Sequence, residues 1–111
     1  MIIANRTLKL RTAADIVDIP IRFYAAEQSD NGAWSCRYEI EWPDGKRTMD
    51  SWGIDSTQAI LLAFQMVGSE LYTTNYHKAG ALFFEAPGRG YGFPIASSLR
   101  DLLIGDDRKF Y

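Results

Sequence analysis

The chain has 111 residues, of which 47% are hydrophobic and 23% charged, a composition typical of one globular domain. Its formal net charge of −2 disfavours a protein that works mainly on nucleic-acid phosphates or anionic lipid. A single cysteine, Cys36, excludes an internal disulfide and fits a reducing compartment. The sequence contains no recognisable signal peptide or membrane-spanning run, so we predict a cytoplasmic protein without membrane contact.

Four segments in the first half of the chain show the alternation of apolar and polar residues that is typical of β-strands. Polar turn sequences at 27–32 and 43–45 separate the later segments. Pro20 cannot donate to a ladder, so its strand lies at a sheet edge or Pro20 faces away from the partner strand. We predict an antiparallel meander whose strands span residues 2–11, 17–25, 34–42 and 46–52.

Asp55 and Gln58 fit a capping box at the start of the main helix. We expect the Asp55 side chain to accept from the N–H near Gln58, and Gln58 to reach back to the N–H of Asp55. Ile54 is expected to pack onto Ala59, and the helix is expected to end before Gly80. Capping is favoured here over a polar binding site, which would combine the side chains of Asp50, Asp55, Ser56 and Gln58.

The rest of the chain predicts shorter elements. Residues 81–85 form a short strand, residues 86–94 a loop, and Ser97 or Ser98 caps a short helix that Gly105 ends. Residues 106–111 form a mixed-charge tail. We therefore predict a single α+β domain over residues 1–111: an antiparallel four- to five-stranded meander packed on one long α-helix, plus a short C-terminal helix.

Few residues suggest catalysis. His77 is the only histidine and Cys36 the only cysteine, so one chain cannot assemble a zinc site from these ligands. Cys36 is expected to be buried and inert, and His77 to lie on the surface near a helix end. We predict no metal, no cofactor, no catalytic residues and no enzyme activity.

The Gly88-Arg89-Gly90-Tyr91-Gly92 segment is the most unusual stretch of the sequence. Its glycines free the backbone, and Arg89, Tyr91 and Phe93 are candidate binding residues, together with Arg37 on the third strand. A loop that packs on its own protein is nevertheless favoured over a binding loop. The segment lacks the Lys-Ser/Thr of a phosphate-binding loop.

The sequence from Trp34-x-Cys36-x-Tyr38-x-Ile40 to the Gly53-Ile54-Asp55-Ser56-x-Gln58-Ala59 helix entry resembles a family of short, uncharacterised bacterial proteins. Those proteins show a Gly-Val-Asp-Ser-x-Gln-Ala-Leu-like helix entry. The resemblance implies a bacterial cytoplasmic domain and no catalytic residues. The order of strands and helix also resembles double-stranded-RNA-binding-type and HicB-type antitoxin folds, but Asp55 stands where such RNA binders carry basic residues.

The leading functional prediction is a non-enzymatic protein-interaction module of an immunity-like or regulatory kind. Its partner is expected to be a protein, with a second copy of the chain in a homodimer as one option, because an open meander has exposed edges. Nucleic acid is not the expected partner. The alternative is a small-molecule or nucleic-acid binding domain that uses Arg89, Tyr91 and Arg37.

Overall fold

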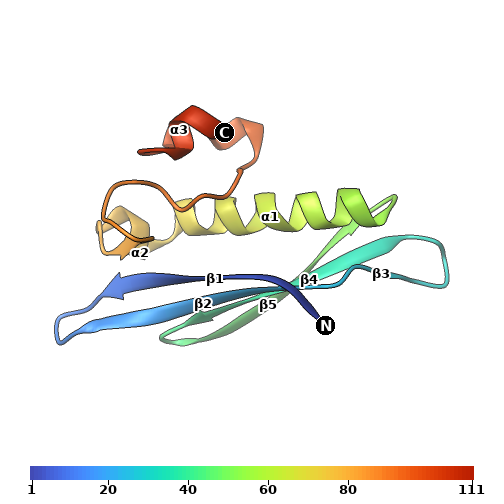
Figure 1. Ribbon diagram of the computed structural model, residues 1–111, viewed down its shortest axis with the longest axis horizontal. Helices are drawn as coiled ribbons and strands as arrows, with labels where there is room; N and C mark the ends of the chain where they lie inside the picture. The colour runs from blue at the N-terminus through green and yellow to red at the C-terminus, as the bar shows by residue number, and fades with distance from the viewer.

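The computed structural model describes residues 1–111 and has three layers (Figure 1). An antiparallel sheet forms the lowest layer, helix α1 crosses the upper face of the sheet, and the C-terminal segment lies above α1. The strands are β1 (Ile2–Arg11), β2 (Ile16–Tyr24), β3 (Glu27–Gln28), β4 (Trp34–Trp42), β5 (Gly45–Gly53) and β6 (Leu82–Phe83). The helices are α1 (Ser56–Thr73), α2 (Asn75–Lys78), a 3-10 helix (Ser97–Leu102) and α3 (Asp107–Phe110).

The predicted α+β class and the antiparallel meander are confirmed. β1 pairs with β2, β2 with β4, and β4 with β5, all antiparallel. Two short strands complete a six-stranded sheet, because β3 pairs with the start of β4 and β6 pairs with the end of β1. The sequence did not predict β3, since its two residues lie within a polar turn segment.

Pro20 does not mark a sheet edge, because β2 lies between β1 and β4. The other possibility left open by the sequence applies, namely that Pro20 faces away from a partner strand. Pro20 pairs with Thr7 of β1, and the pairing of β2 with β4 ends one residue away at Ile21. The missing N–H of Pro20 therefore falls where the β4 ladder has ended, so no ladder bond is lost.

The alternation in the strands places one apolar face under α1. Fully buried side chains of β1, β2 and β4 point to this face and meet the inner side of α1. Burial of such side chains supplies the main stabilisation of the fold, at roughly 1.5–3 kcal/mol for each large one. These inward residues are Leu8, Leu10, Ile19, Ile21, Phe23, Cys36, Tyr38 and Ile40 from the sheet, with Ala59, Ala63, Val67 and Leu71 from α1.

The start of α1 is capped as predicted by Asp55, whose Oδ1 accepts from the backbone N–H of Gln58 at 2.8 Å. The return bond differs by one residue, because Gln58 Oε1 accepts from the N–H of Ile54 at 2.7 Å, not from that of Asp55. The predicted packing of Ile54 onto Ala59 is wrong. The Ile54 side chain is 82% exposed, whereas Ala59 is buried against the sheet.

Replacement of Asp55 by Ala is expected to lower the free energy of unfolding by about 1 kcal/mol, because the Gln58 N–H loses its acceptor. Urea unfolding followed by far-UV circular dichroism measures the change. The control is Thr57→Ala. Thr57 is exposed and lies two residues after Asp55 in the first turn of the helix, so its replacement should have a much smaller effect. An unfolding midpoint of Asp55→Ala equal to that of the wild type would contradict the capping role.

The main helix ends before Gly80, as predicted, but Gly80 is not the residue that ends it. α1 stops at Thr73, and Thr74 caps the separate helix α2 by accepting from the N–H of His77 at 3.1 Å. Gly80, with φ +71°, follows α2. Its left-handed conformation therefore ends the second helix and not the first.

Gly68 lets the C-terminal segment approach α1. A Cβ at this position would overlap the carbonyl oxygen of Pro94 and lie 2.9 Å from Ile95 Cγ2. The close neighbour is thus the segment above the helix, and not a strand of the sheet. Because Pro94 contributes backbone atoms, the neighbour cannot swing aside as a flexible side chain would.

Gly68→Ala is therefore expected to destabilise the protein by about 1–3 kcal/mol through overpacking. In a free helix the same change would stabilise by about 1 kcal/mol. Thermal and urea unfolding determine the sign, with Leu61→Ala on the exposed side of α1 as the control. A gain in stability for Gly68→Ala would contradict the packing of residues 94–95 on the helix.

The C-terminal segment differs most from the sequence-based predictions. Ser97 and Ser98 do not cap the short helix, which is a 3-10 helix preceded by Ala96 without a side-chain cap. Within the predicted mixed-charge tail, residues 107–110 form the short helix α3. Asp107 is 2% exposed, although it lies in a short charged segment. No helix in the structure has the length and hydrophobicity needed to cross a bilayer.

Candidate functional site

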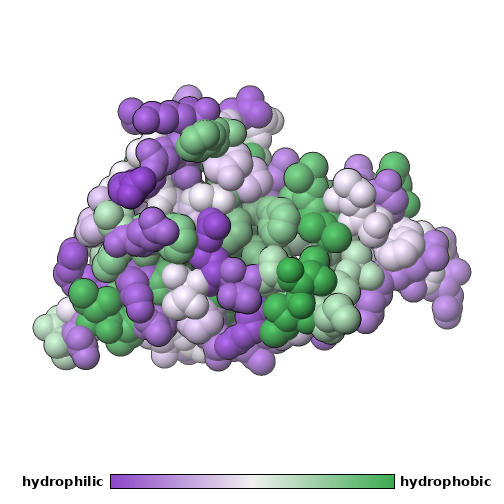
Figure 2. Space-filling model, viewed as in Figure 1, coloured by the Kyte–Doolittle hydropathy of each residue, from purple (hydrophilic) through white to green (hydrophobic).

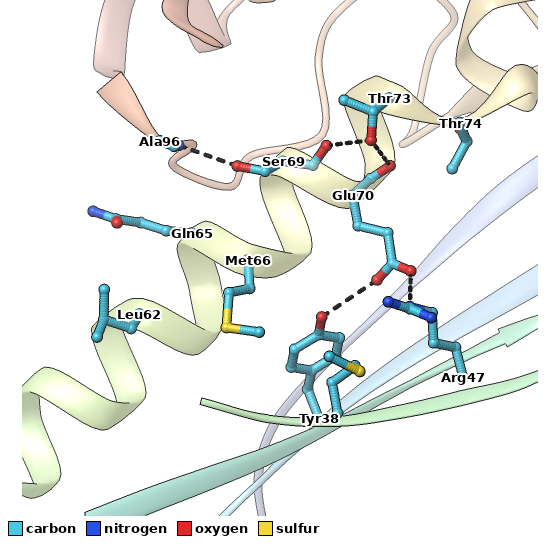
Figure 3. A pocket seen from close by; sticks show the side chains of 11 residues that line it. Tyr38, Arg47, Leu62, Gln65, Met66, Ser69, Glu70, Thr73, Thr74 and Ala96 are labelled. Atoms are coloured by element: carbon cyan, nitrogen blue, oxygen red, sulfur yellow. Dashed lines mark hydrogen bonds and ion pairs between the residues drawn. The ribbon is translucent and has the colours of Figure 1, made fainter. Parts of the chain in front are cut away.

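A groove of about 700 Å³ runs between α1 and the strands β4 and β5 (Figure 3). Leu62 and Met66 line its helix side, and Met49 of β5 lines its sheet side. The three residues are half-buried, so the groove offers apolar surface to solvent. Its polar end is formed by Tyr38, Arg47 and Glu70, with Gln65, Ser69, Thr73, Thr74 and Ala96 also in the lining.

The polar end of the groove is a bonded cluster of three side chains. Tyr38 Oη donates to Glu70 Oε2 at 3.4 Å, and Arg47 Nε forms an ion pair with Glu70 Oε1. Burial raises the pKa of the Glu70 carboxyl above its usual value, and burial raises the pKa of Tyr38 to about 12. Arg47 opposes the shift of Glu70. The cluster therefore presents a tyrosine hydroxyl beside a carboxylate that Arg47 neutralises, an arrangement that can bind a polar group of a ligand.

The opposite face of the sheet carries a second hollow, of about 270 Å³, at the ends of β2, β4 and β5. Arg37 and Trp52 line it, together with Tyr24, Asp50 and residues near the N-terminus. Trp52 is 54% exposed. Arg37 Nε pairs with Asp50 Oδ1 at 3.2 Å, so the candidate binding residue Arg37 lies in an aromatic, mixed-charge hollow.

Ion pairs join neighbouring strands on this outer face, as expected from the charged residues that alternate with apolar ones in the strands. Arg22 contacts Glu41 at 2.7 Å, and Lys46 contacts Glu39 at 3.4 Å. Tyr24 Oη donates to Glu39 Oε1 at 2.6 Å, and this bond is the main cause that lowers the pKa of Glu39. Both side chains of the Arg37–Asp50 pair on this face are exposed, and exposed pairs contribute only a few tenths of a kcal/mol to about 1 kcal/mol each. A partner's charges can therefore replace this pair at small cost in stability.

The glycine-rich loop packs on its own protein. Tyr91 is 1% exposed and Phe93 is 6% exposed, so neither side chain offers a surface to a partner in this conformation. Arg89 is exposed and pairs with Asp106 Oδ2 at 2.8 Å. The binding prediction for this loop therefore falls on Arg89 alone, and Arg89 lines a different surface hollow from Arg37.

Two side chains that the sequence did not single out hold this loop. Arg6 of β1 donates to the carbonyls of Tyr91 and Gly92 at 2.9 and 3.1 Å. Asp107 of α3 accepts from the N–H groups of the same two residues at 2.8 and 2.9 Å. We call these four bonds from Arg6 and Asp107 to residues 91 and 92 the loop clamp. Glycine is required at position 90 beside the loop clamp, because its φ is +95° and a Cβ there would lie 2.5 Å from Asp107 Cγ.

The clamp continues into a buried aromatic cluster. Tyr72 Oη of α1 donates to Asp107 Oδ2 at 2.5 Å, and the Tyr91 hydroxyl is bonded to His77 Nδ1. The Tyr72 and Tyr91 rings pack edge to face with centroids 5.0 Å apart. His77 is therefore half-buried in the structure and not a surface residue, and burial lowers its pKa. The cluster joins α1, the loop and α3, which indicates a structural role.

The remaining sequence-based candidates lie where their residue types suggest. Cys36 is fully buried, and burial raises the pKa of its thiol, which keeps it protonated and unreactive. Asp55 and Gln58 act at the helix cap. The structure contains no group of three His, Cys, Asp or Glu side chains that is arranged to hold a metal ion.

A comparison with protein-family models assigns residues 4–95 to a domain of unknown function, DUF6968. The chain belongs to this family. The DUF6968 match covers the sheet except for the first two residues of β1, together with α1 and the loop as far as Ile95, and it ends before the 3-10 helix and Asp107. It agrees with the predicted membership of a family without an assigned function. No curated protein matches the chain, and no solved structure matches it.

Proposed function

We propose that this DUF6968 domain is a non-enzymatic protein-interaction module, immunity-like or regulatory, that binds its partner with the outer face of the sheet. One observation carries the proposal. Trp52 is 54% exposed beside Arg37, on a sheet face that no helix covers (Figure 1). Trp and Arg are the residues that most often dominate the binding energy of protein interfaces. Coverage of the exposed ring by a partner adds hydrophobic stabilisation at about 25 cal/mol per Å² of apolar surface.

The charges of this face favour a protein over a nucleic acid. Arg22, Arg37 and Lys46 each contact a carboxylate of the same chain, so they do not form the free basic patch that phosphate binding needs. A protein partner with charges of both signs suits such a face better. In this proposal the protein acts inside a bacterial cytoplasm, as the family resemblance implies.

A small-molecule binding domain is the second candidate, and the groove beside α1 is the observation that favours it. Its volume of about 700 Å³ falls in the range of ligand pockets. Tyr38 and Glu70 supply polar groups at one end, and Met66 supplies apolar surface. A thermal-shift screen of metabolites would identify such a ligand, and Tyr38→Phe should abolish the shift.

The proposed function is tested by quantitative affinity capture from lysate of the source organism, with and without nuclease. Wild type, Trp52→Ala and Arg37→Ala serve as baits, and Leu61→Ala, which removes an exposed apolar residue from α1, is the matched control. The proposal predicts one stoichiometric protein partner that survives nuclease and is retained by Leu61→Ala. The same partner should be lost with Trp52→Ala and weakened with Arg37→Ala.

Two results would refute this function. A partner retained equally by all four baits would show that the outer face is not the binding surface. Loss of the partner on nuclease treatment would move nucleic-acid binding ahead of it, and binding should then weaken steeply with salt.

A further inference from the structure

We infer that the free edge of β5 is a homodimer interface, at which β5 pairs antiparallel with β5 of a second copy about a two-fold axis at Thr48. The inference goes beyond the proposed function, because it uses the edge of the sheet and leaves the outer face open. Exposed sheet edges suggested a homodimer from the sequence, and the inference specifies which strand and which register would form its interface.

β5 is a long edge strand of the sheet. Its nine residues pair with β4 in one continuous register, and no strand pairs with its other side. The opposite margin is different, because β6 pairs with the end of β1 and the Arg6 side chain holds the loop at Tyr91. β5 has no proline and no bulge, and it is nine residues long, so three of the features that blunt edge strands in monomeric proteins are missing. It does carry the charged residues Lys46 and Arg47, but both already pair with carboxylates of the same chain, Glu39 and Glu70.

The backbone of β5 is aligned for this pairing. Trp42 and Gly45 close the two-residue turn between β4 and β5, and hydrogen-bonded pairs alternate along an antiparallel ladder from that point. Residues 45, 47, 49, 51 and 53 therefore bond to β4. The N–H and C=O groups of Lys46, Thr48, Asp50 and Trp52 point away from β4, toward the free edge.

The charges select the register. With Thr48 opposite Thr48, Lys46 of each copy lies opposite Asp50 of the other on the outer face. Within one chain Arg37 already pairs with Asp50, and Lys46 with Glu39. The dimer therefore extends two exposed pairs into a network of alternating sign. Registers centred on Arg47 or Asp50 place like charges opposite each other and are disfavoured.

The position of α1 fits the same arrangement. α1 packs over β4 and β5, close to the free edge. Because strands lie about 4.8 Å apart, a helix centred between β4 and β5 lies about 5 Å from the two-fold axis. The two copies of α1 are then about 10 Å apart, which is helix-packing distance. Leu62, Met66 and Met49, which line the groove on this side, would face the second copy.

Sedimentation equilibrium of the full chain tests the dimer. The wild type should have twice the 12.6 kDa mass of one chain at tens of micromolar. Lys46→Asp and Asp50→Lys each bring like charges together across the axis and should raise the dimer dissociation constant about tenfold or more. The double variant exchanges both signs and should recover the dimer. Lys9→Asp on β1, which changes an exposed lysine that pairs with Asp18, should have no effect.

Disulfide trapping tests the register. Opposed hydrogen-bonded residues have Cα atoms about 5.5 Å apart, which a disulfide spans, so Thr48→Cys should form an intermolecular disulfide under mild oxidation. Lys46→Cys is the matched control, because its two copies would lie four residues apart along the strands. Cys36 is buried and does not interfere.

The inference is overturned by a wild-type protein that stays monomeric at 100 μM and above, or by a dimer in which Thr48→Cys cross-links no better than Lys46→Cys. A monomer that still captures a Trp52-dependent partner would leave the proposed function intact. Conversely, a Thr48-centred dimer with no such partner would refute the proposed function alone.

Discussion

Replacement of Asp107 by Ala is expected to lower the free energy of unfolding by about 3–5 kcal/mol. The Asp107 carboxylate is 2% exposed and accepts from the Tyr72 hydroxyl and from the N–H groups of Tyr91 and Gly92. Removal of the carboxylate leaves all three donors without this acceptor, and two of them, the Tyr72 hydroxyl and the Tyr91 N–H, are buried. Each buried unpaired donor costs about 1–3 kcal/mol, so the loss is a large share of a typical domain's stability.

Asp106→Ala is the matched control for Asp107→Ala. Asp106 is the preceding residue, but its side chain is 42% exposed and contacts only the surface residue Arg89 among charged groups. Its replacement should change the free energy of unfolding by less than about 0.5 kcal/mol. Urea unfolding gives both values, and hydrogen exchange at the Tyr91 and Gly92 amides reports whether the clamp opens. Equal effects of the two substitutions would refute the anchoring role of Asp107.

Tyr91→Ala is expected to destabilise the protein by about 3–5 kcal/mol, because it empties the space of a fully buried aromatic ring. The ring packs against Tyr72 and His77, and its hydroxyl also donates to Leu82 O at 3.4 Å. Tyr91→Phe retains the ring and removes only the hydroxyl. It should therefore cost about 1 kcal/mol.

The control for Tyr91→Ala is Arg89→Ala, two residues earlier in the same loop. Arg89 is exposed, so its removal should leave stability within about 0.5 kcal/mol of the wild type. Calorimetry gives the ranking of the three variants. If Tyr91→Ala melts at the wild-type temperature, the loop is not packed as the structure shows. Arg89→Ala is also the better probe of binding by this loop, because it does not disturb the fold.

The strands and the start of α1 were predictable because their signals are local. Alternation in 34–42 reports which side chains face the helix, and the Asp55–Gln58 spacing reports the cap. Ile54 shows the limit of this reasoning. Its position fits a staple, but no tertiary neighbour covers it, and it remains 82% exposed.

The loop clamp was not predictable, because its members are distant in sequence. Arg6 contacts residues that lie more than 80 positions later, and Asp107 stands in a short charged segment that reads as a solvated tail. An aspartate becomes a buried acceptor only when α1 and residues 90–92 present donors to it. The available signal was indirect: glycines on both sides of Tyr91 indicate close backbone approach, which favoured the self-packed loop.

The candidate binding surface was partly predictable. Arg37 on the charged face of the third strand was identified from alternation, and the structure places it beside the exposed Trp52. Trp52 was assigned only to the end of a strand, because alternation alone does not show that a sheet face is left uncovered.

Figure 2 shows a further apolar area right of centre, near the N-terminus in Figure 1, where Ile2 and Ile3 are also exposed.

Photo-cross-linking in cells of the source organism tests the central claim, that the outer sheet face is the binding surface. A photoreactive derivative of phenylalanine, which keeps an aromatic ring at position 52, replaces Trp52 in one variant and Leu61, exposed to a similar extent on α1, in the other. The account predicts one prominent protein adduct from position 52 and none from position 61. Equal adducts from both positions, or no adduct from position 52, would contradict it.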